Sequence, residues 1–569
     1  MKFNQTARIR FLALVILSLA LLFVVRLFFL QVVRFSHYKD EADLQHFSPG
    51  TARLYDRGTI FFTDKVGKKI SAATLSTSYL LVMNPKLIKS AEEVWKKVSS
   101  LVQLDREKFF RSATKNDPYE ELAENLDKKT ADQISALKIT GLYPIKKRER
   151  FYPAGQSAAH VIGWLGYQGN EYSGRYGLEK FYDKTLSRDK DVSFANFFVE
   201  TFATLSKKSN SSEASSIQGD VVTTIEPVVQ KFLESQLVEA NEHWKGDSIA
   251  GMIMDPQTGE IFAMAAYPTF DPDGKITDLS VLPNPFVEHI YEMGSTIKPI
   301  AMAAALDAGV VTVGTTYNDT GCILVSGKKI CNYDGRARGV VSMQEILNQS
   351  LNVGMTFVAK QLGMKNFRQY YEAFGFGEKT NIDLPGELNN HIKNIYEPYE
   401  VNYATAAFGQ GISLTPISTA RALAVLGNGG YLVEPHIVKE IAYQNKLSKV
   451  VAPKRIRQVI KKETSEEISR MLVKVVDEKL ANGKAKLEHY SVAAKTGTAQ
   501  MVDPTTGKYY SDRYLHTFFG YFPAFNPRFI VFMYIKYPKG VRYSSETLTE
   551  PFSNLTKFLL NYYQVPPDR

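Results

Sequence analysis

The sequence predicts an α+β protein of two or more domains behind a single N-terminal membrane-spanning helix. Three observations indicate this class. The chain has 569 residues, which is too long for one ordinary hydrophobic core. One long apolar segment stands near its start, and no second one follows. From Gly219 onward, strand-like runs and alanine-rich helical runs alternate without an internal repeat.

The composition excludes several broad classes of protein. With 44% hydrophobic and 22% charged residues, the chain is not mostly disordered, collagen-like or a polytopic membrane protein. Lysine and arginine outnumber aspartate and glutamate by 69 − 59 = 10. These charges are scattered, so they do not choose between lipid headgroups and nucleic acid as partners. Two cysteines are too few for a disulfide-built scaffold or a cysteine-rich zinc site.

The N-terminal apolar segment covers residues 11–32 and contains one charged residue, Arg26. A helix of this length crosses a hydrocarbon core of about 30 Å. Three basic residues precede it, so the positive-inside rule makes residues 1–10 a cytoplasmic tail. A cleaved signal peptide is the alternative, but no small-residue cleavage site follows the run. We therefore expect a single-pass anchor in the cytoplasmic (inner) membrane, with the rest of the chain in the periplasm or extracytoplasmic space.

The cysteines and histidines predict no metal or cofactor site. Cys322 and Cys331 flank a Ser-Gly turn signal between short apolar runs, which indicates a hairpin. A disulfide across this hairpin and two free thiols are both compatible with an exported domain. The nine histidines show no metal-ligand spacing, and no phosphate-binding loop is visible. His516 stands beside apolar residues, which favours a core or edge histidine.

Composition divides the exported part into two expected domains. Residues 33–205 form a mixed α/β domain without a catalytic cluster, in which 91–104 has helical spacing and 78–85 reads as a strand. Residues 206–218 hold six serines and no aromatic residue, which favours a flexible loop or linker. Residues 219–569 form the second domain.

Local patterns predict hairpins and helices inside the second domain. The segments 248–268 and 516–538 each consist of two strand-like runs around a turn. The alanine-rich run after Pro299 reads as a helix that stops at Gly309. Residues 552–563 read as a closing amphipathic helix.

Ser295 is the first candidate catalytic residue. Gly294 allows a sharp turn before it, and Pro299 falls in the first turn of the following helix, where a missing N–H is tolerated. Ser295 and Lys298 stand at i and i+3 and so share one helix face. A lysine made neutral by burial or a nearby cation can take the serine proton, and the helix N-terminus stabilises an oxyanion. Because the chain contains six Ser-x-x-Lys tetrapeptides, this motif alone is weak.

Two further motifs strengthen the assignment of Ser295. The single Ser-x-Asn, at Ser350 and Asn352, offers a hydroxyl for proton relay and an amide for a peptide backbone. An ordinary helix cap is the alternative for this motif. Lys495-Thr496-Gly497 occurs once, in a strand-like run. Its lysine and threonine can bind a carboxylate, while the glycine lets a substrate backbone lie against the strand.

In this order the three motifs resemble the signature of penicillin-binding proteins and serine β-lactamases. Over nearly the whole chain, the sequence is similar to class B penicillin-binding proteins, which are monofunctional transpeptidases. The resemblance implies a pedestal or dimerisation-like domain over 33–205 and a penicillin-binding transpeptidase domain over 219–569, with an antiparallel sheet packed between helices. The segments that carry it beyond the motifs are 53–64, 175–183, 219–227, 254–272 and 408–430, and the departures are Met293, Glu226 and a degenerate 53–64.

The resemblance implies an acyl-enzyme mechanism of peptidoglycan cross-linking. Ser295 would be acylated by the penultimate D-Ala of a stem pentapeptide, with Lys298 as its base. Ser350 would relay a proton to the leaving amine, helped by Lys495. The amine of a second stem peptide would then attack the acyl-enzyme, and β-lactams would trap Ser295 by mimicking D-Ala-D-Ala.

The resemblance also implies which residues bind substrate. Asn352 would hold the peptide amide of the stem peptide. Thr496 and Thr498 would bind its terminal carboxylate, beside the open strand surface at Gly497. The backbone N–H groups of Ser295 and Thr498 would form the oxyanion hole. No metal and no cofactor are implied.

Several alternatives remain open. A β-lactamase is disfavoured because Pro385 stands where class A enzymes have a glutamate for the deacylating water. A non-catalytic penicillin-binding receptor would need more than ten cytoplasmic residues, and a pure scaffold would not need three intact motifs. Among transpeptidases, the division (FtsI-like) type is preferred over the elongation type by analogy. The resemblance implies peptidoglycan, β-lactams, the membrane, a SEDS-family glycosyltransferase and other division proteins as partners, and no nucleic acid.

Overall fold

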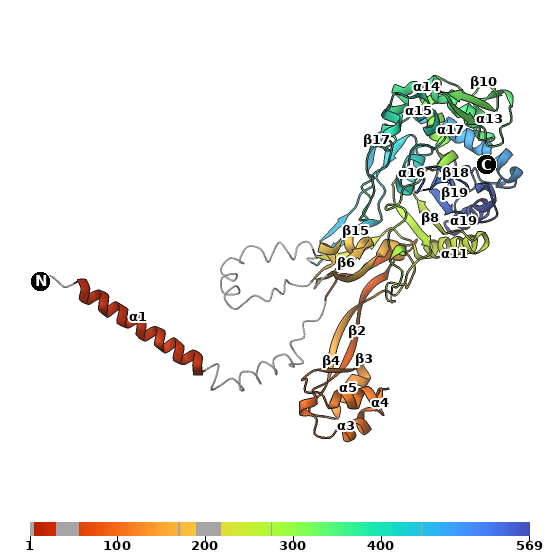
Figure 1. The fold of residues 1–569 in the computed structure, drawn as a ribbon. Helices are drawn as coiled ribbons and strands as arrows, with labels where there is room; N and C mark the ends of the chain where they lie inside the picture. Colours follow the sequence, from red (N-terminus) through yellow and green to blue (C-terminus); the bar gives the residue numbers. More distant parts are fainter. Residues whose placement is uncertain are drawn as a thin grey trace. The chain divides into compact units, whose positions relative to one another are not determined.

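The computed structural model describes residues 5–29, 56–168, 171–188, 218–274, 276–444, 447–503 and 505–569 (Figure 1). It divides into two compact units. The first holds Met1–Asp56 and Leu75–Glu149, and the second holds Arg57–Thr74 and Arg150–Arg569. The serine-rich segment expected to be a loop, 206–218, lies outside the described residues except for its last position. The domain boundaries expected from the sequence stay a prediction.

The N-terminal helix α1 spans Gln5–Phe28 and so begins before the apolar run itself. Its apolar side chains are solvent-exposed from Phe11, which is 71% exposed, to Phe28. Residues 30–32 of the expected span lie outside the described residues. No helix in the described ranges is long and apolar enough to cross a membrane, so the membrane-spanning segment expected at 11–32 is not confirmed.

The first unit packs three short helices against a small sheet. The end of β2 (Lys69–Met83) pairs antiparallel with β3 (Glu120–Leu126), and β4 (Leu142–Phe151) also pairs with β2. Residues 78–83 of the expected strand 78–85 are therefore the end of a longer one, while Asn84 and Pro85 already belong to the turn that follows. Each helix begins at a side-chain cap and buries apolar residues such as Phe109 and Val98. The helices are α3 (Ala91–Val98), α4 (Arg106–Ala113) and α5 (Lys128–Ala136).

The expected helix 91–104 ends early, at Val98, because two serines follow and close the last turn. Val102 is nevertheless buried in the same core as Val94 and Val98. The apolar spacing of this segment was therefore interpreted correctly, while the length of the helix was not.

The second unit contains residues that come before Leu75–Glu149 in the sequence and residues that come after it. Strand β1 (Ile60–Thr63) pairs antiparallel with the start of β2 and parallel with β7 (Gly219–Thr223). On its other edge β7 pairs with β15 (Val438–Tyr443). Residues from about 57 and from about 219 thus share one sheet, which local sequence patterns did not indicate.

A buried ion cluster ties the early part of the second unit together. The Glu179 carboxylate is fully buried and accepts hydrogen bonds from Arg57 Nε at 2.7 Å and Arg150 Nε at 2.6 Å. Both arginines are themselves buried. Buried charges are tolerated only when paired and hydrogen-bonded, so this cluster fixes how the segments meet.

The second unit is organised around a five-stranded antiparallel sheet in the order β18-β19-β20-β8-β9. Both predicted hairpins, 248–268 and 516–538, are confirmed within it. The strands are β8 (Ser248–Met254), β9 (Ile261–Tyr267), β18 (Ala493–Val502), β19 (Tyr509–Phe522) and β20 (Phe529–Lys536).

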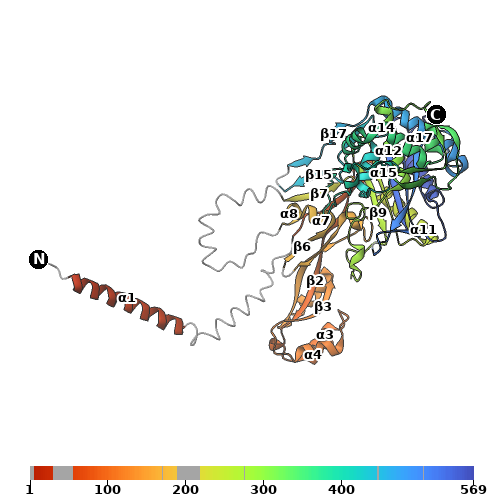
Figure 2. The same cartoon turned by 45° about the horizontal axis from the view of Figure 1, so that its top comes forward.

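Alternate residues of this sheet enter two different hydrophobic cores. On β20, for example, Phe532 and Tyr534 join one core, whereas Val531 and Met533 join the other. Helices α11 (Pro227–Trp244) and α19 (Thr549–Tyr562) cover the face of the second core. The first core contains the helical layer of α12 (Lys298–Asp307), α14 (Asn352–Ala373) and α17 (Lys462–Lys474), which Figure 2 shows near one another. The sheet is therefore packed between helices, as expected.

Shorter elements complete the two units. They are the short 3₁₀ turns η2 (Pro85–Leu87), η3 (Leu279–Val281), η4 (Gly294–Ile297), η5 (Lys393–Tyr396) and η7 (Leu480–Gly483), the π-helical turn η6 (Val475–Lys479), the helices α6 (Ala159–Ile162), α7 (Gly177–Phe181), α8 (Asp183–Leu186), α13 (Met343–Asn348), α15 (Glu400–Ala406), α16 (Pro416–Ala424) and α18 (Ser544–Thr547), and the strands β5 (Trp164–Gln168), β6 (Glu171–Tyr176), β10 (Thr316–Asp319), β11 (Cys322–Val325), β12 (Lys328–Cys331), β13 (Gly339–Ser342), β14 (Tyr431–Val433), β16 (Ser448–Val450) and β17 (Arg455–Gln458).

Candidate active site

Ser295 lies on a tight turn that leads directly into helix α12. Gly294, before it, has a φ of 61°, a conformation that favours glycine, and opens the turn η4. Pro299 falls at the start of α12, as the sequence predicted. Ser295 is half-buried, whereas Lys298, one turn later, is fully buried. The hydroxyl thus stands at the edge of the core and the amine inside it.

Strand β18 packs against this turn because Gly497 has no side chain. A Cβ at Gly497 would lie 2.8 Å from the carbonyl oxygen of Met293 and 3.0 Å from the amide nitrogen of Thr296. From the other side, a Cβ at Gly294 would lie 3.0 Å from the carbonyl oxygen of Thr498. The Ser-x-x-Lys and Lys-Thr-Gly motifs are therefore in contact, and the space at Gly497 is occupied by the serine turn.

Ser350 lies in a sharp bend between α13 and α14. Its φ is 56°, in the left-handed region that residues other than glycine rarely adopt. The cap position of α14 is Leu351 and makes no side-chain cap hydrogen bond, so the alternative of an ordinary serine cap is excluded. Strained backbone of this kind is often retained where a side chain has a functional position.

Lys298 joins the first motif to the second. Its Nζ donates hydrogen bonds to the carbonyl oxygen of Ser350 at 2.5 Å and to Asn352 Oδ1 at 2.8 Å, and it lies 3.1 Å from Ser350 Oγ, whose hydroxyl can donate to the lone pair of a neutral amine. Burial, and the nearby charge of Lys495, lower the pKa of Lys298 well below its usual range. An amine held this way is poised to be neutral, as a base for serine must be.

The side chains of the third motif alternate along β18. Thr496 and Thr498 are half-buried on one face, whereas Lys495 and Gly497 are buried on the other. Lys495 Nζ donates to the carbonyl oxygen of Thr496 at 3.0 Å, and burial lowers the pKa of Lys495 to about 8. Thr498 Oγ1 accepts a hydrogen bond from the backbone N–H of Ser544 at 3.1 Å. The two threonines thus share one face of β18, opposite to the face on which Gly497 meets the serine turn.

Two contacts differ from the simplest sequence-based picture. Among the hydrogen bonds of the described residues, none joins Lys298 Nζ to Ser295 Oγ, because the amine is directed to the second motif. Such catalytic hydrogen bonds are often long without substrate. The Asn352 amide is also engaged at both ends, since its Nδ2 donates to the carbonyl oxygen of Cys331 at 3.0 Å. Each end retains capacity for one more hydrogen bond.

Several residues at this site were not identified from the sequence. Thr517, on β19, donates to the Met293 carbonyl oxygen at 2.9 Å and so supports the serine turn. Asn332 accepts a hydrogen bond from the Val353 N–H at 3.1 Å, at the start of α14. Glu292 accepts hydrogen bonds from Tyr509 Oη. These residues belong to no short motif, and their contacts depend on tertiary pairing alone.

The remaining sequence-based expectations can be located in the fold. Cys322 and Cys331 form a disulfide at the open end of the β11–β12 hairpin, which resolves the question left open by the sequence. His516 is fully buried between Thr547 and the Arg542 carbonyl oxygen, and burial lowers its pKa to about 4, so it is a core histidine. Glu226 caps α11 by accepting a hydrogen bond from the Val229 N–H.

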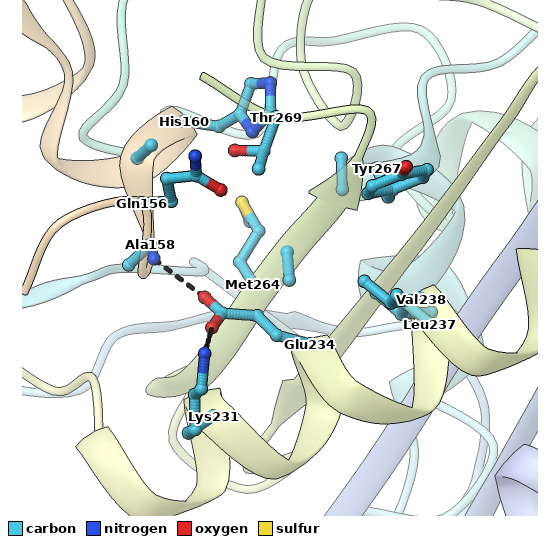
Figure 3. A pocket seen from close by; sticks show the side chains of 13 residues that line it. Gln156, Ala158, His160, Lys231, Glu234, Leu237, Val238, Met264, Tyr267 and Thr269 are labelled. Atoms are coloured by element: carbon cyan, nitrogen blue, oxygen red, sulfur yellow. Dashed lines mark hydrogen bonds and ion pairs between the residues drawn. The ribbon is translucent and has the colours of Figure 1, made fainter. Parts of the chain in front are cut away.

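A separate cavity of about 120 Å³ lies between α11, β9 and the segment before α6 (Figure 3). Glu234 lines it and accepts a hydrogen bond from the Ala158 N–H at 2.9 Å, and it also pairs with Lys231. None of the residues of the three motifs lines this cavity. Among the described residues, no group of three or more His, Cys, Asp or Glu side chains is arranged to hold a metal ion.

Two family models match the chain. Residues 249–557 match the penicillin binding protein transpeptidase domain. Residues 56–197 match the penicillin-binding protein dimerisation domain. The first match covers more than half of the chain and contains all three motifs.

Relatives and solved structures agree with these matches. The chain is 31% identical to stage V sporulation protein D of Bacillus subtilis over 87% of this chain and 76% of that protein. It is 27% identical to peptidoglycan D,D-transpeptidase FtsI of Buchnera aphidicola subsp. Schizaphis graminum over 100% of this chain and 96% of that one.

Among solved structures, the fold resembles penicillin binding protein 2X of Streptococcus thermophilus, with a TM-score of 0.75, 22% identity and coverage of 90% of this chain and 80% of that one. It also resembles penicillin binding protein 3 of Mycobacterium tuberculosis complexed with aztreonam, with a TM-score of 0.68, 22% identity and coverage of 91% and 98%.

Proposed function

Since this chain belongs to the family of class B penicillin-binding protein transpeptidases, we propose that it cross-links peptidoglycan stem peptides through an acyl-enzyme on Ser295. The observation that carries this proposal is the Lys298 amine, buried behind Ser295 and bonded to both Ser350 and Asn352. The same reaction with a β-lactam in place of D-Ala-D-Ala leaves Ser295 blocked.

Acylation begins with transfer of the Ser295 proton to neutral Lys298. The serine oxygen attacks the carbonyl carbon of the penultimate D-Ala, and the backbone N–H groups of Ser295 and Thr498 stabilise the oxyanion. Supporting this placement, the Ser295 turn lies so close to the Thr498 backbone that a Cβ at Gly294 would lie 3.0 Å from the Thr498 carbonyl oxygen. Terminal D-Ala then leaves as an amine.

Proton delivery to the leaving amine runs through Ser350. Its hydroxyl lies 3.1 Å from Lys298 Nζ, so a proton taken from Ser295 can pass along this contact. At pH values below its pKa of about 8, Lys495 is protonated and keeps a positive charge near Lys298. In the second half of the reaction the same path operates in reverse, and the incoming amine of another stem peptide loses its proton to Lys298.

Substrate binding is assigned to β18 and to Asn352. Thr496 and Thr498 present hydroxyls on one face of the strand, where they bind the terminal carboxylate. Asn352 holds the peptide amide of the stem peptide with the hydrogen-bonding capacity that its two internal contacts leave free. Gly497 keeps β18 close enough to Ser295 for both to reach one substrate.

A β-lactamase activity is disfavoured by the segment after Asp383. Pro385 stands where class A enzymes have a catalytic glutamate, and the nearby Glu387 accepts hydrogen bonds from the backbone and hydroxyl of Thr380. That carboxylate is committed to holding its own loop. The acyl-enzyme therefore awaits an amine rather than an activated water.

We further propose that residues 11–32 anchor the enzyme in the cytoplasmic membrane with residues 1–10 inside and the catalytic unit outside. The apolar sequence and the exposure of the α1 side chains support this placement. Washing membranes with carbonate tests it. The anchored chain stays in the pellet, a variant lacking residues 1–32 is released, and release of the full chain would contradict the proposal.

The proposed physiological role is septal cross-linking beside a SEDS-family glycosyltransferase, because a class B enzyme lacks its own glycan polymerase. Support for a division role comes by analogy from relatives that are named FtsI. Depletion of the protein in growing cells should give filaments. Round, swollen cells would instead assign it to elongation.

The transpeptidase proposal is tested by labelling with a fluorescent penicillin. The variant Ser295→Ala should lose covalent labelling while its circular dichroism stays unchanged. Ser135→Ala is the matched control, because Ser135 begins another Ser-x-x-Lys tetrapeptide, on helix α5, and should label normally. Labelling of Ser295→Ala at the wild-type rate would exclude this nucleophile.

A further inference from the structure

The β11–β12 hairpin borders the second catalytic motif. Its two four-residue strands pair in the register Cys322↔Cys331, and the disulfide joins these two residues at the base of the hairpin. A Ser-Gly turn forms the tip, and Leu324, on β11 two residues before this turn, is 75% exposed. Two strands of this length are marginally stable by themselves, so the cross-link contributes to keeping the base of the hairpin closed.

Two successive residues at that base hold the start of α14. The carbonyl oxygen of Cys331 accepts the hydrogen bond from Asn352 Nδ2 at 3.0 Å. Asn332 Oδ1 accepts the hydrogen bond from the Val353 N–H at 3.1 Å. The hairpin therefore contacts both the side chain of Asn352 and the backbone that follows it.

Asn332 is fixed in turn by a buried network. It is 3% exposed, and its Nδ2 donates to both carboxylate oxygens of Asp319 at 3.0 and 2.9 Å. Asp319 also accepts hydrogen bonds from Tyr317 Oη and from the Arg338 N–H. Because Asp319 stands three residues before Cys322 and Asn332 directly follows Cys331, the network and the disulfide close nearly the same loop.

We propose that the Cys322–Cys331 disulfide, with Asn332, is a positioning element for Asn352 and through it for Lys298. Two hydrogen bonds orient the side-chain amide of Asn352. Its Nδ2 donates to the Cys331 carbonyl oxygen, and its Oδ1 accepts from Lys298 Nζ. Displacing the carbonyl oxygen frees the amide to rotate, and the lysine then loses the oriented acceptor oxygen of Asn352. This inference rests on the proposed acylation of Ser295.

The disulfide can be opened by a dithiol such as dithiothreitol. Two electrons and two protons pass from the dithiol to the two sulfurs, which gives two cysteine thiols and the cyclic disulfide of the reagent. The chain has no other cysteine, so thiol titration reports this reduction alone. Two thiols per chain mark complete reduction.

The experiment compares full-length oxidised protein with protein that has been reduced and then freed of reagent under argon. Acylation is followed at a saturating concentration of a fluorescent penicillin, so that the rate constant and the amplitude of labelling are measured separately. Reduction should slow acylation about five- to tenfold, the effect of losing one oriented hydrogen bond, with full amplitude. Cys322→Ser/Cys331→Ser should acylate at the slow rate with or without the dithiol. Leu324→Ala, an exposed position on β11, should behave as wild type.

The two measured quantities separate positioning from general stability. If the disulfide only stabilised the fold, reduction would lower the amplitude and leave the rate constant of the remaining molecules unchanged, and that result would overturn the inference. An unchanged rate and amplitude with two free thiols would overturn it as well. If oxidised protein fails to acylate, the proposed function itself is refuted, and the inference falls with it.

Discussion

Ser350 offers a test in which catalysis and stability should respond differently. Its φ of 56° costs roughly 1–2 kcal/mol for a residue with a Cβ. In Ser350→Gly this strain disappears, while the extra chain entropy of glycine costs about 0.5–1 kcal/mol and the lost hydroxyl contact about 0.5–1.5 kcal/mol. The free energy of unfolding should therefore stay within about 1 kcal/mol of wild type.

Acylation should respond much more strongly to the same change. The hydroxyl 3.1 Å from Lys298 Nζ is removed, whereas the carbonyl oxygen of residue 350, 2.5 Å from the same amine, remains. Loss of a proton-transfer group lowers rates by about 10²–10⁴-fold, so we expect acylation by a fluorescent penicillin to fall by at least two orders of magnitude.

The matched control is Ser350→Ala, which lacks the hydroxyl but keeps the strain. It should acylate as slowly as Ser350→Gly. Its free energy of unfolding, measured in urea, should be about 1 kcal/mol lower than that of Ser350→Gly. Acylation of Ser350→Gly within threefold of wild type would refute the proton path. A glycine variant less stable than the alanine variant would refute the assignment of strain.

The remaining predictions concern pH, packing and the buried ion cluster. The acylation rate should fall at low pH, because Lys298 becomes protonated, and above about pH 8, because Lys495 loses its proton. In a stopped-flow pH profile, Lys495→Arg should lose the alkaline decline, because arginine stays charged. Gly497→Ala should unfold about 1–3 kcal/mol more easily in urea and acylate more slowly, because its Cβ would lie 2.8 Å from the Met293 carbonyl oxygen, whereas Gly314→Ala, with open space, should be neutral. Glu179→Ala should lose about 3–5 kcal/mol of stability, because buried Arg150 loses its carboxylate partner and Arg57 keeps only the partly exposed Asp183. A thermal midpoint equal to wild type would contradict this.

The sequence was sufficient to predict a serine acyl-enzyme, because each of the three motifs is a short continuous stretch of residues with a distinctive local setting. Ser295 after Gly294, and Lys298 beside Pro299, can be interpreted from turn and helix rules alone. The hairpins of the central sheet were equally accessible, since their strands are adjacent in the chain.

The remaining features depend on contacts between distant segments. The left-handed conformation of Ser350 has no signal in its own sequence, because it follows from packing of the bend against Lys298. Likewise, Asn332 becomes important only when the hairpin meets α14. The role of Gly497 beside substrate stays a prediction, whereas the space at its Cβ position, which Thr517 Oγ1 and the Met293 carbonyl oxygen fill, had no signal in the sequence.

The proposed reaction forms one covalent bond on the enzyme, between Ser295 Oγ and an acyl group. After reaction with benzylpenicillin, proteolysis and mass spectrometry should locate the penicilloyl adduct on the peptide that contains Ser295, with one adduct per chain. An adduct on any other serine, or unmodified Ser295 in protein that has bound the drug covalently, would contradict the mechanism.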